Sequence, residues 1–191
     1  MLSRIRAVLV LCACLFVTGC GSMKIEDFAN TEPKLVLEDY FAGKTKAWGI
    51  FEDRFGDIRR QFVVDIDGQW DGNKLVLTED FIYSDGETEQ RIWTIKRIDE
   101  HTYSGTAADV VGEAVGKTYG QALNWRYTLD LKVGDKTWKV NFDDWMVLQP
   151  DGVLMNRAKV SKWGFNVGEV TIFFRKEDAA AALDQRRAAT G

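Results

Sequence analysis

The stretch Asn124-Trp125-Arg126-Tyr127-Thr128-Leu129-Asp130-Leu131-Lys132-Val133 has the pattern of a β-strand with one dry face and one wet face. Apolar side chains occupy every second position, and the positions between them are polar or charged. Because successive side chains of a strand point to opposite faces of the sheet, this alternation predicts that only one face is buried. The same period continues after Ala47, most clearly in residues 62–66, 75–83, 138–148 and 172–174.

Turn-forming residues separate these alternating runs. They are Asp71-Gly72-Asn73, Ser84-Asp85-Gly86, Asp99-Glu100, Gly134-Asp135 and Pro150-Asp151-Gly152. Each lies between two runs, which is the position of a hairpin turn. The spacing predicts a meander of roughly eight to ten antiparallel strands. Closing such a meander removes its exposed edges, so we expect an all-β protein built as an antiparallel up-and-down β-barrel.

The ends of the barrel domain are predicted from helix signals. Pro33 suits the first turn of a helix and Gly43 suits its end, which predicts a short helix over residues 33–42 that caps the barrel. We expect residues 20–32 to be a tether, residues 33–177 to form the barrel domain, and residues 178–191 to form a tail. Asp178 is placed as an N-cap, so this tail is either a short C-terminal helix or a frayed end.

Residues 104–124 fit no single pattern, because glycine recurs at positions 105, 112, 116 and 120. As a helix, this segment would lose about 1 kcal/mol for each interior glycine relative to alanine. We therefore expect extended or hairpin structure with one face of very small residues. Such a face lets a large group approach the backbone, and a core tryptophan is favoured over a ligand as that group.

The N-terminus has the features of an export signal. Arg4 and Arg6 precede an apolar run over residues 7–17, which is shorter than the roughly 20 residues that span a bilayer. Val17-Thr18-Gly19-Cys20 then resembles the lipobox of bacterial lipoproteins. The resemblance implies that residues 1–19 are a cleaved signal peptide and that Cys20 carries the acyl chains.

Two alternatives remain open at this end of the chain. Residues 2–17 could act as a short membrane anchor, and Cys14 could be the acylated residue in place of Cys20. Gly21 stands where an aspartate is the usual inner-membrane retention signal, so by analogy we expect the periplasmic face of the outer membrane. The protein would contact that membrane through the acyl chains on Cys20.

Composition excludes several classes of function. Removing residues 1–19 removes two arginines and no acidic residue, so the net charge changes from −4 to −6. An acidic chain without a basic run is not expected to bind nucleic acid. His101 is the only histidine, and all three cysteines lie at or before position 20, so we expect no metal site and no cofactor. No catalytic constellation accompanies any serine, and we expect no enzyme.

One carboxylate interrupts the apolar face of a predicted strand. Asp144 shares its parity with Phe142 and Met146 and should point inward, where a lone carboxylate is costly unless it is paired. Arg157 and Lys159 lie on the following strand, and either could supply the partner. Glu79 interrupts another apolar face in the same way. A structural ion pair and a polar anchor for a ligand head group both fit this pattern.

Several short motifs resemble one family of bacterial lipoproteins, known as domain of unknown function 3833. They are Gly112-Glu113-Ala114, Ala122-Leu123-Asn124-Trp125-Arg126-Tyr127, Phe142-Asp143-Asp144-Trp145-Met146, Asn156-Arg157 and Ser161-Lys162-Trp163-Gly164. The resemblance covers roughly residues 25–177 and implies a lipocalin-like barrel. It implies no activity, and Ala47-Trp48-Gly49 is only reminiscent of the Gly-x-Trp signature of lipocalins.

Two functions follow from these expectations. In the first, the barrel binds a lipid or small amphipathic ligand, because its inward parity combines aromatic and charged residues. The ligand-binding candidates are Trp125, Tyr127, Phe142, Asp144, Met146 and Arg157. In the second, the protein is a structural envelope lipoprotein with a filled core, which binds an unknown protein partner through exposed aromatics such as Trp163 or Phe165.

Overall fold

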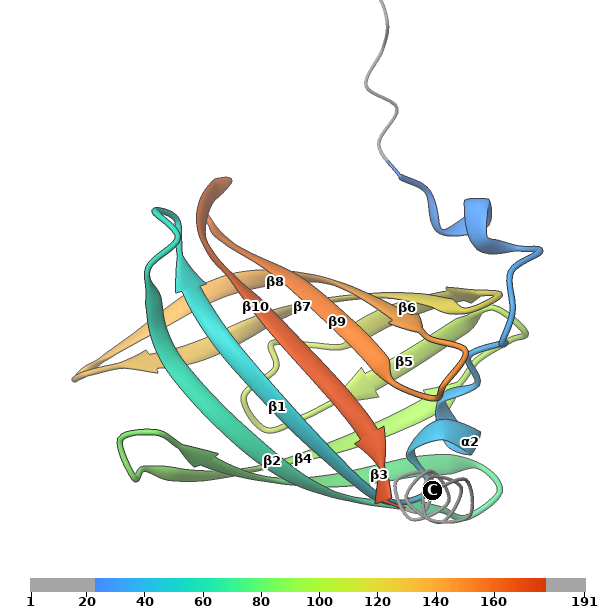
Figure 1. The fold of residues 1–191 in the computed structure, drawn as a ribbon. Helices are drawn as coiled ribbons and strands as arrows, with labels where there is room; N and C mark the ends of the chain where they lie inside the picture. Colours follow the sequence, from blue (N-terminus) through green and yellow to red (C-terminus); the bar gives the residue numbers. More distant parts are fainter. Residues whose placement is uncertain (1–22, 178–191) are drawn as a thin grey trace, which may run out of the picture.

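The protein folds as a closed barrel of ten antiparallel strands (Figure 1), seen in a computed structural model that describes residues 23–177. The strands are β1 (Gly43–Asp53), β2 (Ile58–Trp70), β3 (Lys74–Tyr83), β4 (Thr88–Arg97), β5 (Thr102–Thr106), β6 (Ala114–Tyr119), β7 (Ala122–Val133), β8 (Lys136–Leu148), β9 (Leu154–Lys162) and β10 (Phe165–Lys176). A 3-10 helix, η2 (Ile25–Phe28), and an α-helix, α2 (Leu37–Phe41), precede them.

Each strand pairs with its neighbour in the sequence, and β1 pairs with β10 to close the barrel. The closing register runs from Thr45 opposite Lys176 to Asp53 opposite Gly168. This confirms the predicted all-β up-and-down barrel, at the upper end of the expected strand number. Lipocalin barrels have eight strands, whereas this barrel has ten. The predicted likeness to lipocalins therefore stays a prediction.

The hairpin turns form where the sequence predicts them. In the turn between β2 and β3, Oδ1 of Asp71 accepts hydrogen bonds from the backbone N–H groups of Asn73 and Lys74, both at 2.9 Å. Asp85 caps the turn between β3 and β4 in the same way, accepting from the N–H of Glu87 at 3.0 Å. Aspartate can satisfy backbone donors two residues later, which is why it recurs in these turns.

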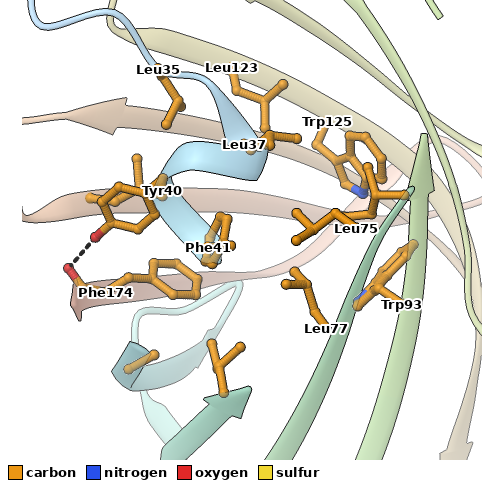
Figure 2. Packing of buried hydrophobic residues seen from close by; sticks show 14 of the residues in the cluster. Leu35, Leu37, Tyr40, Phe41, Leu75, Leu77, Trp93, Leu123, Trp125 and Phe174 are labelled. Atoms are coloured by element: carbon orange, nitrogen blue, oxygen red, sulfur yellow. Dashed lines mark hydrogen bonds between the residues drawn. The ribbon is translucent and has the colours of Figure 1, made fainter. Parts of the chain in front are cut away.

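Helix α2 closes one end of the barrel, but it is shorter than the predicted helix over residues 33–42. The backbone N–H of Leu35 donates to the carbonyl of Gly120, so this part of the chain bonds to the β6–β7 turn and not to itself. Tyr40 and Phe41 of α2 are buried, and the Tyr40 hydroxyl donates to the carbonyl oxygen of Phe174 at 3.0 Å (Figure 2). The helix therefore acts as a plug at the end of β10.

Part of the segment that the sequence predicts as a tether is folded against the barrel. Thr31 donates its hydroxyl proton to the carbonyl of Phe28, and its Oγ1 accepts from the backbone N–H of Gln121 at 3.1 Å. No helix within residues 23–177 is long and apolar enough to cross a membrane. The predicted signal peptide, Cys20 and the tail over residues 178–191 lie outside the described residues.

The segment over residues 104–124 forms β5, β6 and the start of β7, with a loop over residues 107–113, which agrees with the predicted extended or hairpin structure. Two of its glycines lie against a tryptophan. The inner face of β5 and β6 carries Gly105 and Gly116, and the indole of Trp125 lies directly over both. A Cβ added at Gly105 would lie 2.6 Å from Cζ2 of Trp125, and one at Gly116 would overlap the same ring. The core tryptophan, not a ligand, is thus the large group that this face accommodates.

We expect Gly116→Ala to destabilise the barrel, because the new methyl group has no space beside the Trp125 ring. Overpacking of this kind lowers the free energy of unfolding by about 1–3 kcal/mol. Urea unfolding followed by circular dichroism measures the change. Val115→Ala, at the neighbouring exposed position, is the matched control. A Gly116→Ala protein as stable as the wild type would contradict this account of the packing.

Candidate functional site

The barrel encloses a cavity of about 1050 Å³. Its lining begins at Leu37 and Phe41 of the α2 plug and continues to Arg59 and Arg60, where β2 begins at the other end of the barrel. The cavity therefore runs along the barrel from the closed end towards the opposite rim. Its volume is at the upper end of the range for small-molecule sites, roughly 300–1,000 Å³.

Inward residues of β7 and β8 form an aromatic wall of this cavity. The Tyr127 and Phe142 rings stack with centroids 4.9 Å apart, and Trp93 of β4 meets Tyr127 edge-on at 5.4 Å. Trp125 and Met146 also line the cavity. The structure thus brings together the four apolar members of the predicted ligand site.

Asp144 points into the same cavity and is 4% exposed. Its Oδ2 accepts a hydrogen bond from Nδ2 of Asn156 at 3.4 Å, whereas its Oδ1 has no hydrogen-bond partner within residues 23–177. Burial raises the pKa of Asp144 to about 7, although the Asn156 hydrogen bond acts in the opposite direction. The inward position predicted for this carboxylate is therefore confirmed.

The prediction that Arg157 joins this site is wrong. Arg157 lies opposite Trp145 on the outer face, where it forms an ion pair with Glu169 of β10. The residue opposite Asp144 is Ala158, and Lys159 lies opposite Asp143 on the outer face. The physical reason is the strand period, because Arg157 and Lys159 alternate with Asn156 and Ala158, which face inward.

The cation that the cavity does contain is Arg91 of β4, which sequence reasoning missed. Its Nε lies 3.0 Å and its Nη2 lies 2.8 Å from Oδ2 of Asp109, in the loop between β5 and β6. Glu79 of β3 is the cross-strand partner of Arg91, and it faces the cavity as its parity predicted. Arg91 also lies 3.5 Å from Glu89 on the same strand, so Asp109 and Glu89 pair with this guanidinium, while Glu79 and Asp144 line the same cavity.

Burial and charge shift the protonation of this cluster in a consistent way. Burial raises the pKa of Glu79 to about 7, and the positive charge of Arg91 only partly opposes that effect. For Arg91, burial alone would lower the pKa, but the carboxylates of Glu79 and Asp109 outweigh it and raise the pKa. Arg91 therefore stays charged, whereas the carboxyl groups of Glu79 and Asp144 each gain or lose a proton near neutral pH.

A weak signal for Arg91 exists in the sequence. Arg91 shares its parity with Trp93 and Ile95, which are buried, but Ile92 on the other parity is also apolar. The sequence of this strand therefore does not show which of its two faces is buried. Only the hairpin register, which places Arg91 opposite Glu79, decides between the two faces.

His101 belongs to a turn and lies away from the cavity. Its ring nitrogen Nδ1 lies 3.0 Å from the carbonyl oxygen of Thr118, and its ring stacks on Tyr119 with centroids 3.9 Å apart. Between Met23 and Glu177, no three His, Cys, Asp or Glu side chains are grouped so that they could hold a metal ion. Between the plug and the rim, the cavity thus combines the Arg91 guanidinium, the carboxylates of Glu79, Glu89, Asp109 and Asp144 and the Tyr127 hydroxyl with apolar walls.

Comparison with known families gives one match, to the model described as protein of unknown function DUF3833, over residues 14–176. The chain belongs to the DUF3833 family. The match covers all ten strands and the α2 plug, so the cavity lies entirely within the family domain. The sequence matches none of the curated proteins with which it was compared.

The raised pKa of Asp144 predicts a specific pH dependence of stability. The unfolded carboxyl loses its proton near pH 3.8 and the folded one near pH 7, so its contribution to stability is present below pH 3.8 and disappears as the pH rises through about 7. Asp144→Asn removes this titration. We expect the variant to gain a few kcal/mol relative to the wild type across this window, because one pKa unit corresponds to about 1.4 kcal/mol.

Urea unfolding of both proteins below and above this window measures the difference. Asp65→Asn is the control, because Asp65 is an outward carboxylate whose ion pair with Lys46 spans 2.9 Å. A stability difference between Asp144→Asn and the wild type that stays constant with pH would show that Asp144 does not titrate in this way.

Proposed function

We propose that this protein is a lipid-anchored envelope protein whose barrel binds a lipid or small amphipathic molecule. The observation that supports this most directly is the cavity of about 1050 Å³, which combines aromatic walls with a charged inner cluster. An amphipathic ligand has the same division, because its chain is apolar and its head is polar.

The apolar walls supply the binding free energy in this proposal. Burial of each methylene group of a ligand chain contributes about 0.8 kcal/mol. The stacked rings of Tyr127 and Phe142, with Trp93 and Trp125 beside them, offer rigid surface that loses little conformational entropy on binding. The polar cluster then fixes the orientation of the ligand, as a few polar groups do in other apolar pockets.

The lipid anchor is the second part of the proposal, and the Val17-Thr18-Gly19-Cys20 motif supports it. Acyl chains on Cys20 would hold the barrel at a membrane, and Gly21 favours the periplasmic face of the outer membrane. Since η2 begins at Ile25, only a few residues separate the acyl chains from the folded domain. Thr31 of the same segment bonds to Gln121 in the β6–β7 turn, so the anchor would reach the domain at its plugged end, opposite the rim of the cavity.

We expect metabolic labelling with an alkyne analogue of palmitate to mark the wild-type protein and to leave Cys20→Ala unmarked. Acylation needs the thiol, which alanine lacks. Cys14→Ala is the matched control and should be labelled as the wild type is. Loss of the label in Cys14→Ala, or its retention in Cys20→Ala, would reassign the acylated residue.

We expect a ligand to remain bound when the barrel is exported and purified without detergent. Residues 23–177 contain every strand and the plug, so residues 1–22 can be replaced by a cleavable secretory signal. Native mass spectrometry should then show an added mass that dissociates as a small amphiphile. Ala158→Trp, on the cavity wall opposite Asp144, should lose that mass, because the indole fills the space of the ligand.

Arg157→Trp places the same side chain at the neighbouring outward position and should keep the ligand. A bare protein mass from the wild type would contradict the carrier proposal. It would favour the second candidate function, a structural lipoprotein that binds a protein partner.

One observation favours that second candidate. Trp163 is 84% exposed and Phe165 is 74% exposed, at the hairpin end between β9 and β10. Large exposed aromatics are typical of contact sites. The cavity weighs against the filled core that this candidate assumed, so the two functions would use different parts of the barrel.

A further inference from the structure

The cavity contains buried oxygens that accept no hydrogen bond from the part of the chain that the structure describes. Oδ1 of Asp109, Oδ1 of Asp144 and Oδ1 of Asn156 are buried and accept no hydrogen bond from any residue in the 23–177 range. All three residues line the cavity. Buried polar atoms are nearly always satisfied in folded proteins, so three unsatisfied acceptors around one cavity point to a donor supplied from outside the chain.

Three neighbouring side chains carry donors: Arg91, Asn156 and Tyr127, whose hydroxyl lowers the pKa of Asp144. Arg91 directs Nε and Nη2 at the same oxygen of Asp109, Oδ2, which leaves Oδ1 of that carboxylate without a partner. The amide of Asn156 donates to Oδ2 of Asp144, so its own oxygen and the second oxygen of Asp144 remain open. The Tyr127 hydroxyl has a single donor, so it can satisfy at most one of the three oxygens that Arg91 and Asn156 leave open.

The charges agree with this shortage of donors. Glu79, Asp109, Asp144 and, 3.5 Å from Arg91, Glu89 share this one guanidinium, so the cluster has a negative balance whenever more than one carboxyl is ionised. At the rim, Arg59 and Arg60 also line the cavity, but Arg59 pairs with Asp53 and Asp57, and Arg60 pairs with Asp85 and Glu87. These two rim arginines are thus engaged with carboxylates of their own.

We propose that the cavity selects an amphiphile with a primary ammonium head, which would donate hydrogen bonds to Asp144, Asn156 and Asp109. An ammonium group has three donors and no acceptor, which is the complement of the three open oxygens. This inference rests on the proposed function, because it names the head of the ligand that the barrel would carry.

An anionic head fits the same space poorly. A carboxylate has acceptors only, so it would leave the three open oxygens unsatisfied and would bring a further negative charge beside Glu79 and Asp144. A neutral alcohol has a single donor and adds no charge. The site therefore predicts the order ammonium, then alcohol, then carboxylate for heads attached to the same chain.

Isothermal titration calorimetry with decylamine, decanol and decanoate tests this order, with each probe below its micelle-forming concentration. The wild-type barrel, exported as above and freed of bound lipid, should bind decylamine at least about ten-fold more tightly than decanol, because hydrogen bonds to charged groups exceed neutral ones. Asp144→Asn should lose most of this preference, while its affinity for decanol stays close to that of the wild type.

Asp143→Asn is the matched control, since Asp143 is the adjacent carboxylate and lies on the outer face within 3.2 Å of Arg126. It should keep the preference for the amine. The wild-type series remains decisive even if Asp144→Asn is too unstable to purify.

Each other result would overturn the inference in a distinguishable way. Equal affinity for the three probes, or tightest binding of decanoate, would refute the ammonium head but leave the carrier function standing. Binding of none of the probes, together with a bare mass in native spectrometry, would refute the carrier function as well. A preference for decylamine that Asp144→Asn retains in full would show that the acceptors do not hold the head.

Discussion

The pairing of β1 with β10 is the constraint on which the rest of the structure depends. It turns a meander into a closed wall in which every strand of the barrel has a partner strand on each side. It also divides the side chains of every strand into an inner and an outer set. Because the inner set of ten strands surrounds more volume than these side chains fill, closure creates both the core and the cavity.

The two ends of the barrel differ in how densely side chains fill the interior. Near α2, one buried cluster extends from Leu35 and Phe41 of the plug segment to Trp125 of β7 (Figure 2). The glycines of β5 and β6 leave the space that the Trp125 ring occupies. Beyond Tyr127, the buried residues form a separate small cluster of Leu129, Val140 and Val160. The plug therefore stabilises one end, and the cavity lies along the barrel between the plug and the opposite rim.

Alternation and turn chemistry in the sequence were sufficient to predict the barrel and five of the inner residues of the candidate site. These signals are local, since they depend only on the strand period and on residues such as Asp71 that satisfy their own turns. The prediction for Arg157 did not apply this period, since Leu154, Ala158 and Val160 of β9 share the buried parity and Arg157 lies on the other one. A shift of one residue exchanges the two faces of a strand.

Arg91 and Asp109 were missed for a different reason. Arg91 lies on a strand with apolar residues on both faces, and Asp109 lies in a loop that has no period. That loop is placed by a bridge between Val110 and Leu129 and by the N–H of Asp130, which donates to the carbonyl of Asp109 at 2.8 Å. Such contacts between distant segments carry no local sequence signal. The same bonds hold Asp109 beside Arg91, so the loop completes both the barrel wall and the charged cluster.

The energetic cost of this cluster is what connects the fold to a function. Burying charged groups is expensive, and replacing them with well-packed apolar residues is often neutral or stabilising. A barrel selected for stability alone would be expected to place an apolar side chain at position 144, between Phe142 and Met146 on the inner face. The protein instead keeps a carboxylate there whose raised pKa measures the cost of its burial. Asn156 satisfies only one of its two oxygens, so the structural ion pair is the weaker explanation and a role towards a bound molecule the stronger one.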